Sequence, residues 1–413
     1  MRKNCPLKIL SLLILFHVAL SNCFSQQTPP MGWNSWNEFG VNVSEDLIKE
    51  VCDAMKAHKL DECGYKYIVI DDGWQAKELG NNGLLEASPE KFPAGMLNLS
   101  NYLNCNGFEL GIYSSPNIRT CADFPGSLGL EKKHAGQFAQ WGAKFLKYDY
   151  CPTRNGEQGN APDTILARLK NMKSALDEVD PDIVYAICEK GWYGGQIKNA
   201  RKFRTQRTIS SENRYELFEW APALGTMWRT TMDIRPDWEK IMQILDAQDG
   251  LARLSGPGSF NDPDMLEVGN GDLTSAENRA HFSLWCMLAA PLFLGNDVRN
   301  IPDDVLSIIT NKEVIALNQD KLCKQAAKVS DANSIEVFLK PLYDGDWGIC
   351  ILNRNESPRQ VECKWDNFDI QPESIASVRD LWKHKNIKHS KKSINVLIEA
   401  HDVKVYRITA VSD

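Results

Sequence analysis

Short apolar segments alternate with amphipathic segments after the double proline at 29–30, and the alternation occurs eight times. The apolar segments are 31–36, 67–71, 109–114, 145–149, 184–189, 227–233, 255–262 and 291–297. Several of them are continuous rather than alternating, which is typical of parallel strands buried on both faces. We therefore predict eight parallel strands.

The amphipathic segments between these strands predict helices. Ser44 can cap the first helix, and the apolar positions after it form one stripe: Leu47, Ile48, Val51 and Met55. The segments near 129–141, 163–178, 236–253 and 275–288 have a similar pattern. Eight strand–helix units in about 285 residues favour a (β/α)8 TIM barrel over an open doubly wound sheet, which would usually be shorter.

The pattern changes near residue 320. Ile335, Val337 and Leu339 alternate with other residues, and Asp344-Gly345-Asp346 marks a turn. The last part of the chain therefore predicts an antiparallel β-sandwich domain. We expect a signal peptide over 1–25, the barrel over 26–318 and the β domain over 319–413.

The N-terminus has the pattern of a signal peptide. Basic residues precede an apolar stretch over 9–20, which at 12 residues is too short to span a bilayer. Small residues at 23–25 offer a cleavage site before Gln26, which predicts a secreted or periplasmic protein with no membrane span. Cys23 could instead be a lipid attachment site, but Asn22 before it fits that motif poorly.

Export would permit disulfides. Of the 12 cysteines, Cys5 and Cys23 lie in the signal, so ten remain, which is too sparse for a disulfide scaffold. Cys121 and Cys151 are the first choice for a bridge because both follow predicted strands near one end of the fold. Cys52 and Cys63 are the second. No CxxC or HxxxH spacing occurs, so we expect neither a metal nor a cofactor.

Composition narrows the class of protein. With 43% hydrophobic and 24% charged residues, the 413-residue chain resembles neither a disordered protein nor a membrane transporter. A net charge of -7 argues against nucleic acid as a partner. Twelve tryptophans, many beside carboxylates, suit a carbohydrate partner, although about half would be expected in an ordinary core. The sequence specifies neither a monomer nor a homo-oligomer.

Carboxylates follow most of the predicted strands. They are Asp71, Asp72, Asp149, Glu189, Asp233, Asp262 and Asp264. Helix capping could explain one or two of them, but several lie beside aromatic or basic residues: Trp36, Trp74, Tyr113, Lys147 and Arg229. Since a TIM barrel places its chemistry at the C-terminal ends of its strands, these groups predict an active site.

Paired carboxylates with aromatic neighbours point to glycoside hydrolysis. One carboxylate attacks the anomeric carbon while the other donates and then accepts a proton. Asp149 on the fourth strand and Asp233 after the sixth are near enough around a barrel to flank one bond.

Six ordered motifs carry a family resemblance. They are 31–36 (MGWNSW), 70–74 (IDDGW), 147–149 (KYD), 228–233 (WRTTMD), 261–265 (NDPDM) and 290–297 (APLFLGND). Together they resemble the α-galactosidases of glycoside hydrolase family 27 over residues 30–320, and the C-terminal domain is also similar to that of the family. The resemblance implies a retaining exo-glycosidase that releases terminal α-D-galactose.

The resemblance also implies a role for each matched position. Asp149 would be the nucleophile, kept ionised by Lys147, and Asp233 would be the general acid/base. For that role we expect the pKa of Asp233 to exceed that of Asp149, with Met232 contributing by desolvation. The implied substrate-binding residues are Trp36, Asp71, Asp72, Tyr113, Lys147, Cys188, Glu189, Arg229 and Met265. Asp71 and Asp72 would bind the sugar 4- and 6-hydroxyls.

Three positions depart from the family pattern. Gly73 replaces a cysteine common in relatives, Lys190 replaces a tryptophan after the Cys-Glu pair, and Met232 replaces a small or polar residue. An α-N-acetylgalactosaminidase would be expected to have small residues near 188–192, whereas Glu189 and Trp192 are bulky.

Other functions remain as alternatives. A β-L-arabinopyranosidase would be expected to replace one of the 71–72 carboxylates by an apolar residue, and both are present. A sugar-binding barrel without catalysis would not need Asp149 and Asp233 together. A metal-dependent hydrolase on Asp71, Asp72 and Asp264 lacks histidine ligands.

Overall fold

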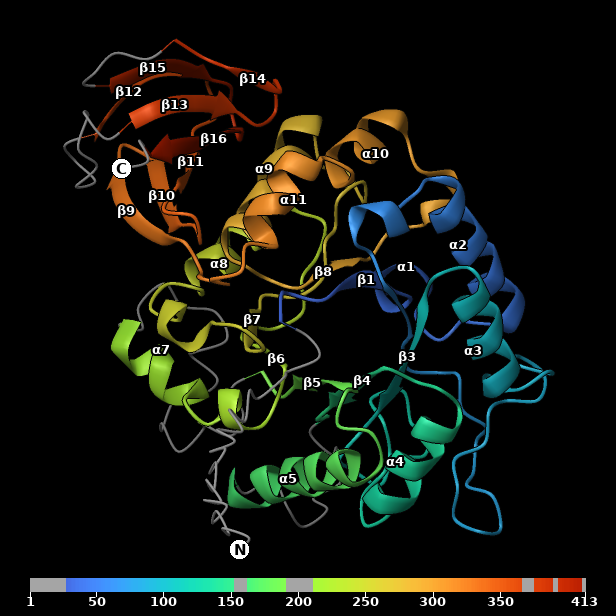
Figure 1. The fold of residues 1–413 in the computed structure, drawn as a ribbon. Coiled ribbons are helices and arrows are strands. Elements are labelled where there is room, and N and C mark those ends of the chain that lie inside the picture. The colour runs from blue at the N-terminus through green and yellow to red at the C-terminus, as the bar shows by residue number, and fades with distance from the viewer. Residues whose placement is uncertain (1–26, 152–161, 191–210, 366–374, 389–392, 411–413) are drawn as a thin grey trace, which may run out of the picture.

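The structure is a computed structural model, which describes residues 27–151, 162–190, 211–365, 375–388 and 393–410. Within these residues no helix is long and apolar enough to cross a membrane. The predicted signal peptide over 1–25, including Cys23, lies outside the described residues. Figure 1 shows a strand-lined barrel surrounded by helices, with a smaller β domain beside α9 and α11.

Eight parallel strands form the barrel, and adjacent strands pair in the order β7-β6-β5-β4-β3-β2-β1-β8. Their bounds are β1 Met31–Asn34, β2 Tyr67–Ile70, β3 Glu109–Ser114, β4 Phe145–Asp149, β5 Val184–Cys188, β6 Met227–Arg229, β7 Phe260–Asp262 and β8 Leu292–Leu294. Leu266 connects the two ends of the sheet, because its N–H donates to the Phe293 carbonyl and its carbonyl accepts from the Gly295 N–H. The predicted TIM barrel is confirmed.

The strands are shorter than several of the apolar segments that predicted them. β6 ends at Arg229, and the chain from Thr230 to Asp233 leaves the sheet. β5 likewise ends at Cys188. The residues beyond these strands turn over the end of the barrel, which allows their polar side chains to converge there.

Helices surround the barrel (Figure 1). Those in the described residues are α1 Trp36–Phe39, α2 Glu45–Ala57, α3 Met96–Cys105, α4 Glu131–Gln140, α5 Pro162–Val179, α7 Ser211–Phe218, α8 Trp238–Asp246, α9 Ser275–Met287, α10 Asp303–Ile309 and α11 Lys312–Asn318. Short 3-10 helices are η1 Asp61–Cys63, η2 Ala221–Ala223, η3 Ala252–Leu254 and η4 Val298–Asn300. Ser44 caps α2 as predicted, since its side chain accepts from the Leu47 N–H. Thr274 and Glu277 form a capping box at α9.

Several tryptophans belong to the core rather than to a binding surface. Trp33, Trp74, Trp228 and Trp285 are fully buried. The Trp74 indole N–H donates to the Tyr113 carbonyl at 3.0 Å. Trp74 therefore supports β3 from within the protein and is not exposed to a ligand. Its position beside carboxylates in the sequence had suggested a sugar-facing side chain.

The C-terminal domain has two antiparallel sheets, which confirms the predicted β-sandwich. The six-stranded sheet contains β9 Ala327–Ala332, β10 Ile335–Pro341, β11 Trp347–Asn353, β13 Ile375–Asp380, β14 Lys385–Asn386 and β16 Val403–Ala410. The second contains β12 Arg359–Lys364 and β15 Ser393–Ile398. An ion pair of 2.6 Å between Arg279 on α9 and Asp402 ties this domain to the barrel.

One predicted disulfide is present and the other is not. Cys121 and Cys151 are bonded, with a Cα–Cα distance of 5.3 Å. Cys52 and Cys63 are free thiols, so their suggested pairing is wrong. Cys52 is buried on the core side of α2, and burial raises the pKa of its thiol to about 12. It acts as a small core residue.

Candidate active site

A cavity of about 430 Å³ opens at the C-terminal ends of the barrel strands. Residues that line it include Trp36, Asp71, Asp72, Tyr113, Lys147, Asp149, Lys190, Arg229, Asp233, Asp264, Met265 and Glu267. All of the predicted substrate-binding and catalytic residues line this cavity except Cys188 and Glu189. Cys188 lines a smaller pocket deeper in the barrel. Glu189 is only 2% exposed and lines neither pocket.

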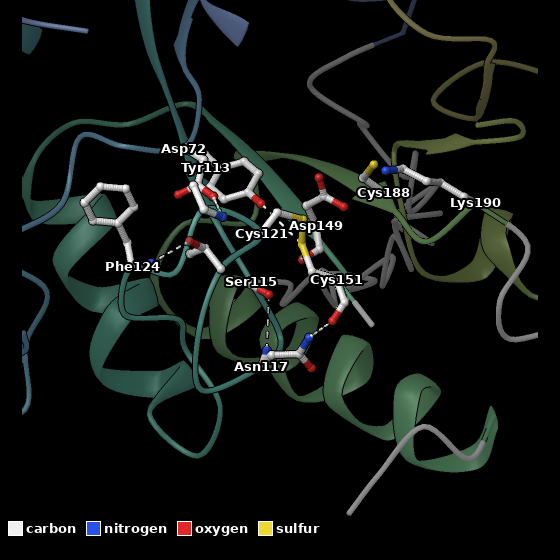
Figure 2. Close-up of a disulfide and its surroundings, with 12 residues drawn as sticks. Asp72, Tyr113, Ser115, Asn117, Cys121, Phe124, Asp149, Cys151, Cys188 and Lys190 are labelled. Atoms are coloured by element: carbon white, nitrogen blue, oxygen red, sulfur yellow. Dashed lines mark hydrogen bonds between the residues drawn. A yellow bond between two sulfur atoms is a disulfide. The ribbon is translucent and has the colours of Figure 1, made fainter. Parts of the chain in front are cut away.

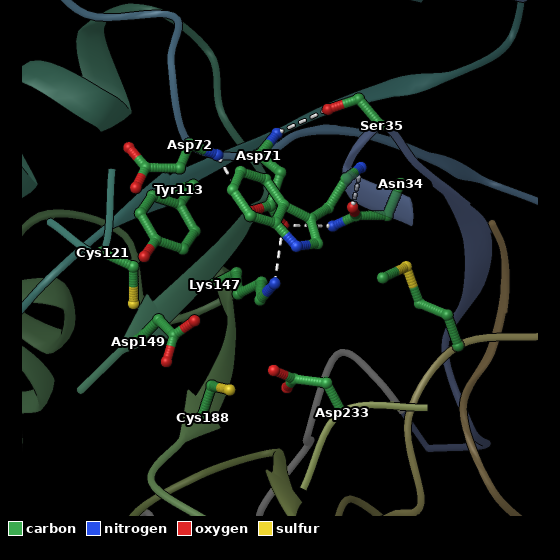
Figure 3. A network of polar contacts seen from close by, with 12 residues as sticks. Asn34, Ser35, Asp71, Asp72, Tyr113, Cys121, Lys147, Asp149, Cys188 and Asp233 are labelled. Carbon is green, nitrogen blue, oxygen red and sulfur yellow. Dashed lines mark hydrogen bonds and ion pairs between the residues drawn. The ribbon is translucent and has the colours of Figure 1, made fainter. Parts of the chain in front are cut away.

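Asp71 is the centre of a hydrogen-bond network on the floor of the cavity (Figure 3). Its Oδ2 accepts from Lys147 Nζ at 2.6 Å and from Asn34 Nδ2 at 2.9 Å. Its backbone N–H donates to Ser35 Oγ at 3.0 Å. Asn34 in turn accepts from the Trp36 N–H at 2.8 Å. The loop after β1 therefore positions both a carboxylate and an aromatic side chain.

Lys147 is paired with Asp71 rather than with Asp149, the partner that the sequence suggested. Both Lys147 and Asp149 point to one side of β4, two residues apart. Burial lowers the pKa of Lys147, but the charges of Asp71 and Asp149 outweigh that effect and raise it. The ammonium is therefore a fixed positive charge between two carboxylates.

Asp149 ends β4 and is 6% exposed. Its Oδ1 is buried and accepts no hydrogen bond within the described part of the chain. Figure 2 shows its carboxylate beside the disulfide and the Tyr113 hydroxyl. Burial and the charge of Asp149 raise the pKa of Tyr113, so its hydroxyl stays protonated. A buried carboxylate oxygen without a partner is a costly arrangement that a ligand could satisfy.

The disulfide adjoins both Asp149 and Asp72. One ligand atom of Asp149 and the sulfur atoms of Cys121 and Cys151 lie within 4.8 Å of one another. Because the two sulfurs are bonded to each other, they are not thiolate ligands for a metal. The next residue, Ala122, donates its N–H to Asp72 Oδ2 at 2.8 Å. The bridge thus fixes the loop that holds Asp72.

Asp72 is 1% exposed, and burial raises its pKa to about 6. The hydrogen bond from Ala122 acts in the opposite direction and favours the ionised form. Its Oδ1 has no hydrogen-bond partner among the residues that the structure describes. Like Asp149, Asp72 therefore presents a buried acceptor at the cavity.

Asp233 lies after β6 with a side chain that is 59% exposed. Its Oδ1 is 3.0 Å from Lys190 Nζ and 3.1 Å from Arg229 Nη2. Burial raises the pKa of Asp233, but the charges of Arg229 and Lys190 outweigh that effect and lower it. The expected raised pKa is therefore wrong for this structure. Met232 is half-buried and does not line the cavity.

Arg229 joins Asp233 to Asp264 on the next loop. Its Nη2 is 2.7 Å from Asp264 Oδ2, and both side chains are 5% exposed. Asp264 also accepts from the Ile234 N–H at 2.8 Å. Arg229 contacts Asp233 directly, and through Asp264 it also fixes the backbone of the next residue, Ile234. The position of Asp264 after the seventh predicted strand indicated that it lies near the site, but the sequence did not indicate that Arg229 is its partner.

Lys190 and Glu267 are among the cavity-lining residues that the sequence did not identify as site residues. The family pattern marks Lys190 only as a departure, and none of the six motifs includes Glu267. Burial raises the pKa of Glu267 to about 7, although Asn270 Nδ2 donates to it at 2.6 Å and Asn37 Nδ2 also donates. Glu267 lies two residues after Met265, which was the available signal. Trp192, which argued against a 2-acetamido substituent, lies outside the described residues.

Comparisons with known proteins agree with this geometry. The family model described as Alpha galactosidase A matches residues 28–320, and that of the Alpha galactosidase C-terminal beta sandwich domain matches 332–408. An "Alpha-galactosidase" from Cyamopsis tetragonoloba is 38% identical over 93% of this chain and 86% of its own. "Alpha-galactosidase A" from Cellvibrio japonicus is 37% identical over 98% of both chains.

A solved structure is also similar. Alpha-galactosidase I from Mortierella vinacea superposes with a TM-score of 0.82 at 32% identity, covering 94% of this chain and 98% of that one. The similarity therefore extends through both the barrel and the β-sandwich.

Proposed function

The chain belongs to the α-galactosidase family, glycoside hydrolase family 27, and we propose that it releases terminal α-D-galactose from galactosides with retention of configuration. Family membership makes it a galactoside hydrolase with α-galactosidase activity. The observation that supports the catalytic assignment is the pair of carboxylates, Asp149 and Asp233, that line one cavity at the strand ends.

Asp149 is the proposed nucleophile. Its Oδ1, which accepts no hydrogen bond from the residues that the structure describes, would attack the anomeric carbon and form a glycosyl–aspartate ester, while Asp233 gives a proton to the departing oxygen. In the second step Asp233 takes a proton from water, the water oxygen bonds to the anomeric carbon, and Asp149 leaves as a carboxylate. Figure 3 shows the two carboxylates directed into the same space from β4 and from beyond β6.

Asp71 and Asp72 are the residues proposed to recognise the sugar hydroxyls. Lys147 and Asn34 occupy Asp71 Oδ2, whereas Asp72 Oδ1 has no hydrogen-bond partner in the described residues. Hydroxyl groups at carbons 4 and 6 of galactose would satisfy such acceptors. A buried acceptor rejects an analogue that lacks the hydroxyl, because the acceptor is then left unpaired. This supports galactose over a sugar without a hydroxymethyl group.

The experiment compares kcat/KM for aryl α-galactoside, aryl α-N-acetylgalactosaminide and aryl β-L-arabinopyranoside. We expect the α-galactoside to be preferred. Asp149→Asn should reduce its turnover by at least about a thousandfold, since the nucleophile is lost. Asp331→Asn, on the exposed surface of β9, is the matched control and should keep full activity. Preference for another of these glycosides would replace the proposed specificity, and galactose binding without turnover would indicate a sugar-binding barrel.

We also propose that the protein is exported. The signal-like pattern over 1–25 and the disulfide between Cys121 and Cys151 support this, since disulfides persist mainly in oxidising compartments. N-terminal sequencing of the protein after expression with its leader tests the proposal. A mature chain that begins at Gln26 is expected, and a lipid-modified Cys23 or a retained leader would contradict it.

A further inference from the structure

Lys190 occupies an unusual position beside the proposed acid/base. It follows β5 and has a backbone φ of 61°, in the left-handed region that residues other than glycine rarely adopt. Its side chain is 11% exposed and places Nζ 3.0 Å from Asp233 Oδ1. A strained backbone and a nearly buried ammonium both cost free energy, so the contact with Asp233 has to offset them.

We propose that Lys190 is a positioning residue for Asp233, which it orients toward the cavity and holds in the ionised form that activates water in the second step. The proposal rests on the proposed function. Its basis is the geometry: Lys190 Nζ, from the turn after β5, and Arg229 Nη2, from β6, both contact the same carboxylate oxygen. Two cations on one oxygen fix the direction of a side chain that is otherwise 59% exposed.

Arg229 alone would orient the Asp233 side chain less well. Its guanidinium has a shorter contact with Asp264, at 2.7 Å, than with Asp233, at 3.1 Å. Part of its charge is therefore neutralised by a second carboxylate. Lys190 supplies an additional charge from the turn after β5, which pairs with β6 on the side away from β7. Figure 2 shows its ammonium beside Cys188.

The charged groups around Asp233 determine whether its pKa rises or falls when the Lys190 charge is removed. The cations that act on it are Arg229 from β6, Lys190 from the turn after β5, and Lys147 from β4, and its charge also acts on Lys240 of α8. Asp264 in the loop after β7 and Asp262 at the end of β7 act on Arg229 and oppose these cations. The cations prevail, and the pKa of Asp233 is lowered. Removing the Lys190 charge should therefore raise that pKa.

A higher pKa of Asp233 in the absence of the Lys190 charge has a kinetic consequence. The first step needs Asp233 protonated, so kcat/KM for a substrate with a poor leaving group falls at high pH as the proton is lost. A raised pKa moves that alkaline limb to higher pH. An activated dinitrophenyl galactoside needs little proton donation, so its kcat/KM should not follow the same limb.

The test compares Lys190→Asn with Lys190→Arg. Asparagine tolerates a left-handed backbone and has no charge, whereas arginine keeps the charge. With methyl α-galactoside, Lys190→Asn should move the alkaline limb of kcat/KM up by about one pH unit, a shift reduced by the exposure of Asp233. Lys190→Arg should restore the wild-type limb. Lys190→Gly, which also suits the backbone, replaces Lys190→Asn if that variant does not fold.

A double variant separates positioning from a structural role. If Lys190 acts through Asp233, Lys190→Asn should change kcat/KM little in an Asp233→Ala background. An unchanged pH limb in Lys190→Asn, or an equal change in kcat/KM with and without Asp233, would overturn the proposal while leaving galactoside hydrolysis intact. A wild-type protein that does not hydrolyse α-galactosides would instead overturn the proposed function.

Discussion

Lys147 Nζ lies 2.6 Å from Asp71 Oδ2, and this pair joins β4 to the end of β2 beneath the cavity. The Lys147 side chain is 14% exposed and that of Asp71 is 2% exposed. Lys147 also faces the side of β4 on which Asp149 lies. One ammonium thus connects the proposed sugar-binding carboxylate with the proposed nucleophile.

Removing this ammonium should damage stability as well as activity. Lys147→Met leaves Asp71 buried without its cation, and breaking such a pair costs about 3–5 kcal/mol of unfolding free energy. Urea unfolding measures the loss. Lys132→Met is the control, because Lys132 and Glu178 form an exposed pair, 74% and 56% exposed, that should contribute less than about 1 kcal/mol. Equal effects of the two substitutions would contradict a buried, structural ion pair at Asp71.

Asp233→Ala should separate substrates by leaving group. Loss of a general acid typically costs about 10²- to 10⁴-fold in rate when the departing oxygen needs a proton. We expect a loss in that range for methyl α-galactoside and less than about tenfold in kcat/KM for a dinitrophenyl galactoside, whose leaving group is already a weak base. Steady-state kinetics on both substrates test this, and equal losses would count against Asp233 as the acid.

Asp72→Ile should change the preference between sugars. The substitution removes the buried acceptor proposed for the hydroxymethyl side, so α-galactosides lose an interaction that β-L-arabinopyranosides never make. The ratio of their kcat/KM values should fall by at least about tenfold. Asp72→Asn, which keeps an oxygen for the Ala122 N–H, is the control and should change the ratio less. An unaltered ratio in Asp72→Ile would mean that this carboxylate does not read the hydroxymethyl group.

Glu267 should make the fold less stable at neutral pH than at mildly acidic pH. Its pKa is raised from 4.5 to about 7 by burial, so the folded state binds its proton more tightly than the unfolded state does. This contribution is fully present below pH 4.5 and is lost as the pH rises through 7, with a size of about 3 kcal/mol. Glu267→Gln should remove that part of the pH dependence. Unfolding free energies of both proteins at pH 4.5 and 7.5 measure it, and identical pH dependence would disprove the assignment.

The barrel was predictable because its strands are buried on both faces and therefore appear as continuous apolar segments. The strand ends were less predictable, since the segment predicted as a strand over 227–233 extends past Arg229, where β6 ends and the chain turns out of the sheet. The suggested disulfide between Cys52 and Cys63 was wrong for a different reason. A small apolar thiol on the core face of α2 and a disulfide cysteine look alike in a sequence.

The site residues were predictable as a group, but their partners were not. The position of Lys147 two residues before Asp149 suggested a pair within one strand, whereas its closest anion, Asp71, follows β2, which is separated from β4 by β3. The contact of Lys190 with Asp233 depends on a left-handed turn that no periodic pattern encodes. The low pKa of Asp233 follows from that contact and from Arg229, so it also required the three-dimensional arrangement.

Retention of configuration through Asp149 and Asp233 is the central claim, and the anomer released first tests it most directly. Proton NMR can follow the anomeric signals of galactose during hydrolysis of an aryl α-galactoside, before mutarotation mixes the two forms. Double displacement predicts that α-galactose appears first and β-galactose grows in later. If β-galactose appears first, a single displacement by water operates and Asp149 is not the nucleophile.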